Sequence, residues 1–298
     1  MQSGSPDLAR QVVAAQSILD TPAAAQAHRL ERALADSCRS LAEALARLDP
    51  SSGAAVLDGP AGVAVFAGAG SPLTQALALG IPGPVSAEAL DRIEAFLDPG
   101  GNGAVQAELC PFADPSAGAL LAERGWRITE WQLVWTRAVP AEPLDPPPPG
   151  VEVRPVRPGE EDACIRAILA GFLESEEVPE EAVALLRPAA HAAGFETWLA
   201  TVDGELAGGA TLSWVDGIAF VNGSGVRPSL RRRGAQGALI RARLGRAREL
   251  GCSVASSSTL PGTSSRRNME RHGFHVAYPK VVLSRPARDG AAVTSPAG

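Results

Sequence analysis

The segment 218–250 constrains the fold more than any other stretch of this chain. Its first part, 218–226, is apolar and predicts a β-strand, and Pro228 marks a turn into a basic loop that contains glycine. Apolar residues then recur at helical spacing for about four turns, and Gly251 ends the helix. The first amides of a helix lack internal partners and carry partial positive charge. A strand, a glycine-bearing turn and a helix start therefore predict an anion-binding site.

The loop differs from both common nucleotide-binding loops. It lacks the Gly-Lys-Ser/Thr ending of a Walker loop, and it lacks Gly-x-Gly-x-x-Gly with an acidic residue downstream. It reads Arg231-Arg232-Arg233-Gly234-Ala235-Gln236, preceded by Val226-Arg227-Pro228. This resembles the acetyl-coenzyme A loop of the GCN5-related N-acetyltransferase (GNAT) family, whose pattern is Arg/Gln-x-x-Gly-x-Gly/Ala after Val-x-Pro. Gln236 departs from the family pattern, which has Gly or Ala at this position.

A second landmark of the family is a helix that ends in Gly-Phe and leads into two strands. Here a predicted helix begins at Ser264 and ends at Gly273-Phe274. The resemblance covers about residues 151–286. It implies an α/β fold with a mixed sheet and helices on both faces, the GNAT-like acyl-CoA acyltransferase fold. Two Asp-Gly pairs, at 203–204 and 216–217, independently predict hairpins and hence antiparallel strands before the loop.

The resemblance implies acetyl transfer from acetyl-coenzyme A, as cosubstrate and without a metal, to an amine of a small-molecule acceptor. The pyrophosphate would lie on the loop amides, the arginines would bind its oxygens, and the pantetheine arm would run beside the preceding strand. An amide of that strand would polarise the acetyl carbonyl. The implied coenzyme-binding residues are Ser224, Gly225, Val226, Arg231, Arg232, Arg233, Gly234, Ala235, Gln236, Gly237, Ala238 and Ser265.

The general acid of the family is missing from its usual position. Many members have a Tyr four residues before the Gly-Phe glycine, where this chain has Met269. Tyr278 is the single tyrosine and is the candidate catalytic residue, with a half-buried packing ring as the alternative. Glu174, Glu176 and Glu177 lie where relatives shape the acceptor pocket, and they predict either an ammonium site or a solvated acidic loop.

An internal repeat relates the two halves of the chain. Residues 121–128 parallel 269–276 at an offset of 148 residues, and 133–137 parallel 281–285 without a gap. The first half therefore looks like a degenerate GNAT-like copy, in which 71–84 replaces the arginine-glycine loop. Chance coincidence of two helix ends is the alternative. A copy without its anion site predicts a packing or substrate-shaping domain.

The repeat and the proline content predict a tandem organisation with an N-terminal helical extension. A leucine stripe predicts helix over 7–48, in two pieces that meet near Thr21-Pro22. The prolines of 140–150 predict a stiff extended linker. The expected units are 1–139 for the extension and degenerate domain, 140–150 for the linker, 151–286 for the catalytic domain and 287–298 for a flexible tail.

Charge and composition narrow the function further. The net charge of the 298 residues is −6, but twelve basic residues lie between Arg227 and Lys280 against two acidic ones. A basic face on an acidic protein that lacks interleaved aromatics fits a small polyanion better than nucleic acid. No long apolar run or signal-like start is visible, and the four cysteines show no metal-ligand spacing. We therefore expect a cytoplasmic enzyme without membrane or nucleic-acid partners, and an oligomer is possible.

Two other functions remain open from the sequence. A coenzyme A-binding module without turnover would explain the missing Tyr and the departure at Gln236. A nucleic-acid-binding protein that uses the arginine patch is the third possibility.

Overall fold

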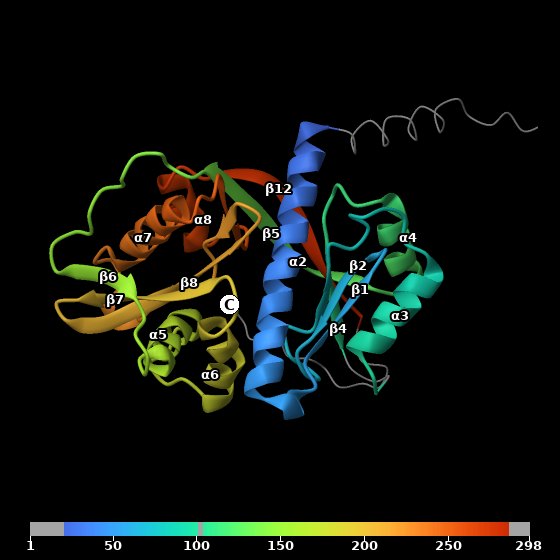
Figure 1. The fold of residues 1–298 in the computed structure, drawn as a ribbon, viewed down its shortest axis with the longest axis horizontal. Coiled ribbons are helices and arrows are strands. Elements are labelled where there is room, and N and C mark those ends of the chain that lie inside the picture. Colours follow the sequence, from blue (N-terminus) through green and yellow to red (C-terminus); the bar gives the residue numbers. More distant parts are fainter. Residues whose placement is uncertain (1–20, 101–103, 286–298) are drawn as a thin grey trace, which may run out of the picture.

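The computed structural model of this protein describes residues 21–100 and 104–285, which form one mixed sheet flanked by helices (Figure 1). The first predicted helical piece, over 7–20, and the tail at 287–298 lie outside the described residues. The strands follow the order β1-β2-β3-β4-β12-β5-β11-β9-β8-β7-β6, and β10 pairs with β8. Their bounds are β1 Ala55–Gly59, β2 Gly62–Phe66, β3 Gln75–Leu77, β4 Val105–Leu109, β5 Arg127–Ala138, β6 Val151–Pro155, β7 Phe195–Val202, β8 Glu205–Val215, β9 Ile218–Phe220, β10 Gly225–Val226, β11 Val254–Thr259 and β12 His275–Arg285.

Helices cover both faces of the sheet, as the mixed α/β pattern predicts. They are α2 Pro22–Leu48, α3 Ala87–Leu97, α4 Pro115–Glu123, α5 Glu161–Leu173, α6 Glu180–Leu186, α7 Ala235–Glu249 and α8 Ser264–Arg271, with 3-10 turns η1 Pro50–Ser52, η2 Arg187–Ala190 and η3 Pro228–Leu230. The helices α3, α4, α7 and α8 pack on one face, and α2, α5 and α6 on the other. Within the described ranges, no helix is long and apolar enough to cross a membrane.

Helix α2 crosses the middle of the sheet, between the two halves of the molecule (Figure 1). It begins where the sequence predicts: Thr21 accepts a hydrogen bond from the amide of Ala24, and Pro22 occupies the first turn. Leu30 of its predicted apolar stripe is buried in the central core. Ser37 hydrogen-bonds Ser213 of β8 with 2.8 Å between the hydroxyl oxygens, so α2 also contacts the C-terminal half.

The two halves exchange their last strands at the centre of the sheet. β5, from the first half, pairs antiparallel with β11 of the second, and β12, from the second half, pairs with β4 of the first. β5 and β12 also pair with each other. Boundaries drawn along the sequence do not reveal this exchange, because each half completes its sheet only with a strand from the other.

The register of β5 and β12 shows that the sequence repeat is a structural one. Thr136 lies opposite His275, and Arg127 lies opposite Ser284. At the 148-residue offset of the repeat, Thr136 corresponds to Ser284 and Arg127 corresponds to His275, so each pair is the repeat equivalent of the other. The two central strands are therefore related by an approximate internal two-fold axis.

The helix ends before these strands are also equivalent. The amide of Trp126 donates to the carbonyl of Leu121 at 3.0 Å, and that of Phe274 donates to Met269 at 3.1 Å. Both bonds belong to Schellman motifs in which Gly125 and Gly273 adopt φ of 76° and 74°. Chance similarity of two helix ends does not account for this agreement in position, bonding and register.

A buried charged cluster ties α2 to the exchanged strand. Lys280 of β12 forms ion pairs with Glu108 of β4 and with Glu31 of α2. The distance between the Lys280 nitrogen and the Glu31 oxygen is 3.6 Å. The Tyr278 hydroxyl donates to Glu31 at 2.7 Å. Burial, opposed by the Lys280 charge, raises the pKa of Glu31. Burial acts to lower the pKa of Lys280, but Glu108 and then Glu31 outweigh it and raise that pKa.

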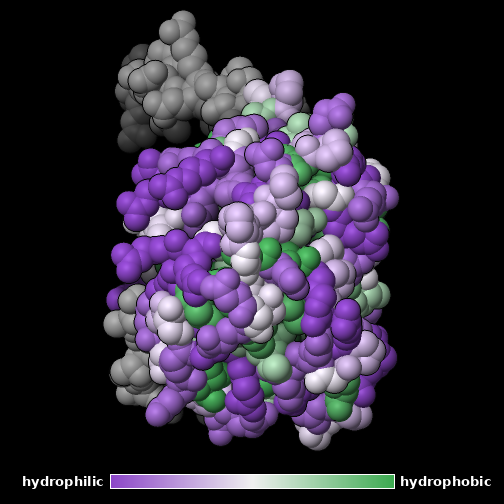
Figure 2. All heavy atoms as spheres, turned by 90° about the vertical axis from the view of Figure 1, so that its left-hand side faces the viewer, coloured by the Kyte–Doolittle hydropathy of each residue, from purple (hydrophilic) through white to green (hydrophobic). Residues whose placement is uncertain are grey.

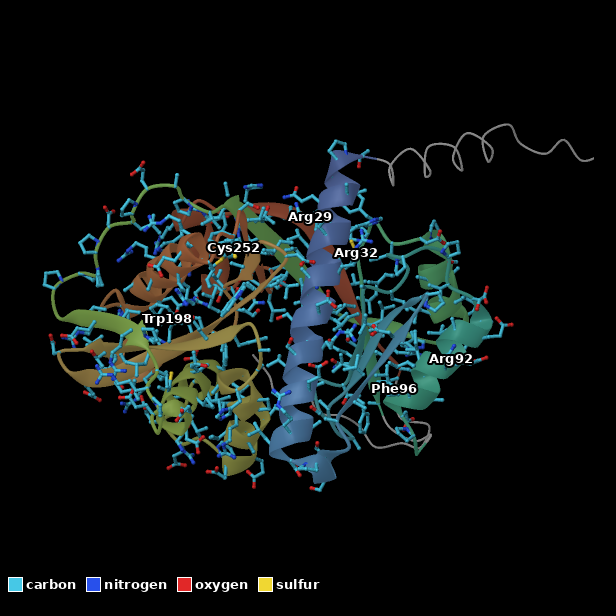
Figure 3. All side chains as sticks on the ribbon, in the orientation of Figure 1. Arg29, Arg32, Arg92, Phe96, Trp198 and Cys252 are labelled. Atoms are coloured by element: carbon cyan, nitrogen blue, oxygen red, sulfur yellow. The ribbon has the colours of Figure 1, made fainter. Side chains whose placement is uncertain are left out.

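All four cysteines are free thiols. Burial raises the pKa of Cys38, Cys110 and Cys164 to about 12, which makes them unreactive at neutral pH. Figure 3 shows Cys252 and Trp198 in the C-terminal half, where both belong to the core under α7.

We expect Lys280→Met to lower the free energy of unfolding by about 3–5 kcal/mol, because it leaves Glu31 and Glu108 buried without a compensating charge. Urea unfolding at pH 7 measures the change. Arg266→Met is the matched control: it removes an exposed pair with Glu270 and should change stability by about 0.5 kcal/mol or less. Equal effects of the two substitutions would show that the cluster does not hold α2 in place.

Candidate functional site

The predicted strand at 218–226 is interrupted after Phe220, where its pairing with β11 ends. β9 pairs in parallel with β11 as far as Phe220 and Ser256, and β10 then pairs with β8 alone. The expectation of one continuous strand is therefore wrong for 221–224. These four residues oppose only three on β8, between the pairs Ser213–Phe220 and Gly209–Gly225, so they form a β-bulge. Bulges are frequent next to active sites because they redirect the chain.

Asn222 holds the bulge in place from both sides. Its side-chain oxygen accepts from the Ser257 hydroxyl at 3.2 Å and the Ser258 amide at 3.3 Å, both on β11. Its carbonyl accepts from the amide and hydroxyl of Thr211 and from Arg243. Across the described part of the chain, the amides of residues 222–224 donate to no acceptor. The bulge thus offers free N–H groups beside the gap between β10 and β11.

Close backbone packing fixes β10 against α5. A Cβ added at Gly171 of α5 would lie 2.5 Å from the amide nitrogen of Val226, and one added at Gly225 would strike the carbonyl of Ile168. Side chains at these two positions would force helix and strand apart. The glycines therefore position the strand that leads directly into the basic loop.

The basic loop and the start of α7 present a continuous run of free amides. Arg232 and Gly234 adopt left-handed conformations, with φ of 62° and 92°. None of the backbone amides from Arg231 to Gly237 donates a hydrogen bond within residues 21–100 and 104–285, and no side chain caps the helix. Unpaired amides at a helix N-terminus form a site for an anion such as a phosphate group.

The first half lacks such a cradle at the equivalent place. Ser86 caps α3 by accepting from the amide of Ala89 at 3.2 Å. The amide of Val85 donates to the Ser116 hydroxyl at 2.8 Å, and that of Gly80 donates to the carbonyl of Ala61. The loop that replaces the arginine-glycine turn therefore satisfies these amides internally.

The three loop arginines do not share one role. Arg231 donates to the carbonyls of Val226 at 3.1 Å and Gly171 at 2.8 Å and pairs with Glu174, so its guanidinium braces the loop. Arg233 pairs with Asp203. Only Arg232 of the three makes no ion pair within the described structure. The expectation that all three arginines contact phosphate stays a prediction, and Arg232 is the one whose guanidinium, within the described residues, has no carboxylate to leave in order to do so.

The acidic loop after α5 is bound to the basic one. Glu176 pairs with Arg227 at 2.7 Å and accepts from the Ser229 hydroxyl at 2.8 Å, while Glu174 pairs with Arg231. Arginine hydrogen bonds lower the pKa of both carboxyls. Two of the three carboxylates expected for an acceptor ammonium are therefore already used as braces.

The proline-rich linker lies against the start of α7. A Cβ on Gly234 would come within 2.6 Å of the Pro148 ring, and Arg241 donates to the carbonyl of Asp145 at 3.0 Å. Gly234 is therefore required both by its left-handed backbone and by the packed linker. Sequence reasoning missed this contact, because linker and loop are far apart along the chain.

Two other predicted residues have clear places in the structure. Gln236 lies in the first turn of α7 and its side-chain oxygen accepts from the Ser224 hydroxyl at 3.1 Å, so the residue that departs from the family pattern joins the helix start to the bulge. Ser265 is exposed in the first turn of α8, and no hydrogen bond in the described chain joins it to the loop.

Tyr278 is placed differently from the sequence-based expectation. Its ring is buried against α2 and packs edge-on against Phe112 at 6.0 Å between centroids. Burial and the Glu31 carboxylate raise its pKa, so its hydroxyl holds its proton. Tyr278 is therefore a structural residue of the buried cluster, which corrects its assignment as general acid. Met269, at the family's Tyr position, is buried in the core.

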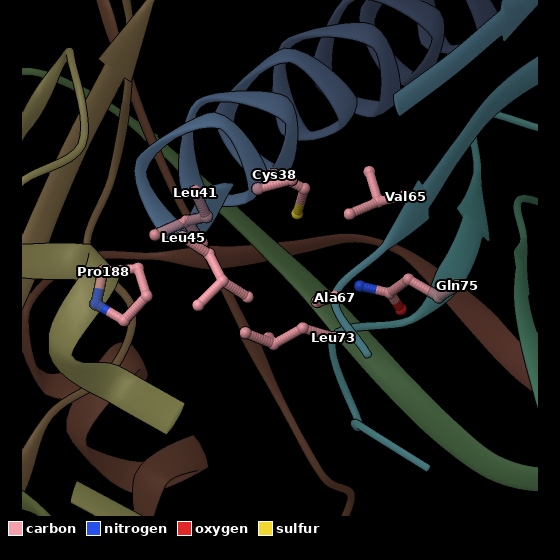
Figure 4. A pocket seen from close by; sticks show the side chains of 9 residues that line it. Cys38, Leu41, Leu45, Val65, Ala67, Leu73, Gln75 and Pro188 are labelled. Carbon is pink, nitrogen blue, oxygen red and sulfur yellow. The ribbon is translucent and has the colours of Figure 1, made fainter. Parts of the chain in front are cut away.

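A small apolar pocket lies elsewhere, between α2, the sheet of the first half and η2 (Figure 4). Its lining residues are Cys38, Leu41, Ala42, Leu45, Val65, Ala67, Leu73, Gln75 and Pro188. None of them belongs to the bulge or the basic loop. Among the described residues, no group of three or more His, Cys, Asp or Glu side chains is arranged to hold a metal ion.

Comparison with solved structures identifies the fold. A GCN5-related N-acetyltransferase from Kribbella flavida is 22% identical, with a TM-score of 0.59 over 86% of this chain and 96% of that one. One from Sphaerobacter thermophilus is 18% identical, with a TM-score of 0.54 over 80% and 78%. A tandem GNAT protein from the clavulanic acid biosynthesis pathway is 16% identical, with a TM-score of 0.56 over 78% and 80%.

Comparison of sequences locates the family signal in the second half. A search of curated proteins found no match. The model of the acetyltransferase (GNAT) family matches residues 164–274, which include the bulge, the basic loop, α7 and α8. Residues 164–274 thus form a GNAT-family domain by sequence, and the chain as a whole has the fold of GNAT proteins, including a tandem one.

Proposed function

We propose that this protein binds acetyl-coenzyme A and transfers its acetyl group to an amine of a small-molecule acceptor. The run of unpaired amides from Arg231 to Gly237 carries the proposal, because it matches the needs of a pyrophosphate and lies within the matched family domain. Arg232 adds a free guanidinium at the same place. The unpaired amides of residues 222–224 would lie along the acyl end of the coenzyme.

Transfer of an acetyl group from a thioester to an amine requires mainly that the protein position the two reactants. A neutral amine attacks the thioester carbonyl, negative charge develops on the carbonyl oxygen, and a thiolate leaves. A free thiol has a pKa of about 8.5, so the thiolate leaves without a general acid more readily than an alkoxide would. This is consistent with Met269 at the family's Tyr position and with Tyr278 being bound to Glu31.

The first half is proposed to bind no coenzyme. Its loop amides at Gly80, Val85 and Ala89 already have acceptors. Its contribution is to supply β5 to the sheet of the second half and to cover that sheet with α2. A test on an isolated fragment of residues 1–140 is not informative, because that fragment lacks β12.

The alternative of a coenzyme A-binding module without turnover rests on the absent general acid. Thiol release from acetyl-coenzyme A in the presence of a panel of amines separates the two functions: release that depends on an amine supports transfer. Mass spectrometry of a metabolite extract incubated with the protein then identifies the acceptor by its gain of one acetyl group.

Nucleic-acid binding through the arginine patch has less support than it has from sequence alone. Figure 2 shows a largely hydrophilic surface at the end of the molecule that carries β6 and β7. Five of the eleven arginines between Arg227 and Lys280 are paired with carboxylates in the described structure: Arg227, Arg231, Arg233, Arg246 and Arg266. Paired guanidiniums release few counterions on DNA, so a small anionic ligand is the better fit. The free thiols, three of them buried, fit the reducing cytoplasm that we propose as the location.

We expect acetyl-coenzyme A to raise the melting temperature, with a stabilisation of roughly 2.7 kcal/mol at 100 times its dissociation constant. Calorimetry should show that Arg232→Ala weakens binding by about 1 kcal/mol or less, and that this loss shrinks at high salt while wild-type binding persists on the backbone amides. Arg248→Ala, which removes an arginine near the far end of α7, is the control. Gly234→Val would confound the result, because its side chain strikes Pro148. No thermal shift at saturating ligand would contradict the proposed function.

Tyr278→Phe should leave acetyl transfer and coenzyme affinity unchanged, while lowering stability by about 1–3 kcal/mol through loss of the hydrogen bond to Glu31. Steady-state rates with any amine that the panel identifies, and urea unfolding, measure the two effects. A large fall in the maximal rate at unchanged stability would restore Tyr278 as a catalytic residue.

A further inference from the structure

Arg243 of α7 is the most unusual buried group near the proposed site. Its side chain is fully buried at 0% exposure, and within the described ranges it pairs with no carboxylate. It donates to the carbonyls of Leu239 at 3.0 Å, Thr211 at 2.7 Å and Asn222 at 2.9 Å, and its remaining terminal nitrogen has no hydrogen-bond partner among the described residues. A buried cation without a counter-ion carries a desolvation cost of several kcal/mol, so its position calls for an explanation.

The Arg243 guanidinium contacts the bulge through the carbonyl of Asn222. The same oxygen accepts from the Thr211 amide at 3.3 Å and hydroxyl at 3.1 Å, so three donors from β8 and α7 converge on it. Because the peptide bond is planar and trans, the N–H of Gly223 points opposite to this carbonyl. It therefore points away from β8 and α7, and it has no acceptor among the described residues.

The Gly223 peptide is held firmly in this orientation. Gly223 has φ of 58°, and a Cβ there would lie 2.6 Å from the Thr211 hydroxyl oxygen, so only glycine fits without displacement. Asn222 is fixed at the same time by its side-chain bonds to Ser257 and Ser258 of β11. An N–H that is rigid, unpaired and backed by a cation on its own peptide has the features of a preorganised oxyanion donor.

Under the proposed function an amide of this strand polarises the acetyl carbonyl, and the unpaired Gly223 N–H is placed to be that amide. We propose that Arg243 is the positioning residue that orients and polarises the Gly223 peptide from behind. The inference rests on the proposed function. As the amine nitrogen forms its bond to the carbonyl carbon, the carbonyl π pair moves to oxygen, where the Gly223 N–H stabilises it. The pair then returns, the carbon–sulfur bond breaks, the thiolate leaves with that bonding pair, and the amine loses its proton to water.

The charge of Arg243 persists at neutral pH. Burial lowers the pKa of its guanidinium to about 9, which still leaves it mainly protonated at pH 7. A cation on the carbonyl of an amide withdraws electron density from that amide and strengthens its N–H as a donor. The effect on the substrate is indirect, so it should be smaller than loss of the donor itself.

The test observes the thioester directly and needs no acceptor. Acetyl-coenzyme A labelled with ¹³C at the acetyl carbonyl is bound to the full-length protein, and its ¹³C chemical shift is compared with that of the free compound. We expect a downfield displacement in wild type, which reports donation to the carbonyl oxygen. Arg243→Met should lose the larger part of the displacement at nearly unchanged affinity, and Thr211→Val, which removes one donor to Asn222, should lose a smaller part. Arg248→Met is the control and should behave like wild type.

A rate measurement complements the spectroscopic one. With any amine acceptor that the panel identifies, Arg243→Met should lower the maximal rate on the order of tenfold while the Michaelis constant for acetyl-coenzyme A changes little, compared with 10²–10³ when an oxyanion donor itself is lost. Arg243→Lys should restore part of the rate, because it returns the charge. Unfolding curves for each variant exclude loss of fold as the cause.

The outcomes distinguish this inference from the function on which it rests. If wild type does not bind acetyl-coenzyme A, the proposed function fails. If wild type binds it but the carbonyl signal is not displaced, or if Arg243→Met and Thr211→Val both give the wild-type displacement, the function stands and the role of Gly223 and Arg243 is overturned.

Discussion

The pairing of β5 with β12 is the interaction on which the rest of this structure depends. β5 comes from the first half and pairs with β11 of the second half, and β12 comes from the second half and pairs with β4 of the first. Without this pairing, the sheet would separate into two pieces with unpaired edges. The first half is consequently part of the scaffold of the GNAT domain, although several amides of its own loop, at Gly80, Val85 and Ala89, are already bonded within the protein.

Two buried cations, Lys280 and Arg243, differ in how their charge is compensated. Lys280 is compensated by Glu31 and Glu108 and joins α2 to the centre of the sheet. Arg243 has no carboxylate partner in the described structure and binds carbonyls at the bulge instead. The first arrangement contributes to stability as long as the charges stay together, whereas the second lowers stability and places a positive charge behind the proposed site.

The contrast between the two halves isolates what the proposed site requires. Both have a strand, a loop and a helix in the same order, and both precede their last strand with the same glycine-aromatic helix end. In the first half, Ser116 accepts from the amide of Val85 and Ser86 accepts from that of Ala89. In the second, the amides from Arg231 to Gly237 are free. The two halves thus share an order of elements and differ in the continuous run of unpaired backbone donors that only the second half presents within the described residues.

The sequence by itself determined the features that depend on neighbouring residues. The helix start at Pro22, the presence of a helix after the basic loop and the glycine-aromatic helix ends follow from local spacing and from the backbone freedom of glycine. Only the tertiary structure decided that Arg231 and Arg233 form ion pairs, that Tyr278 binds Glu31, and that Arg243 reaches Asn222. The physical reason is that these side chains find their partners on elements 21–247 residues away along the chain, and sequence spacing carries no information on such distant pairings.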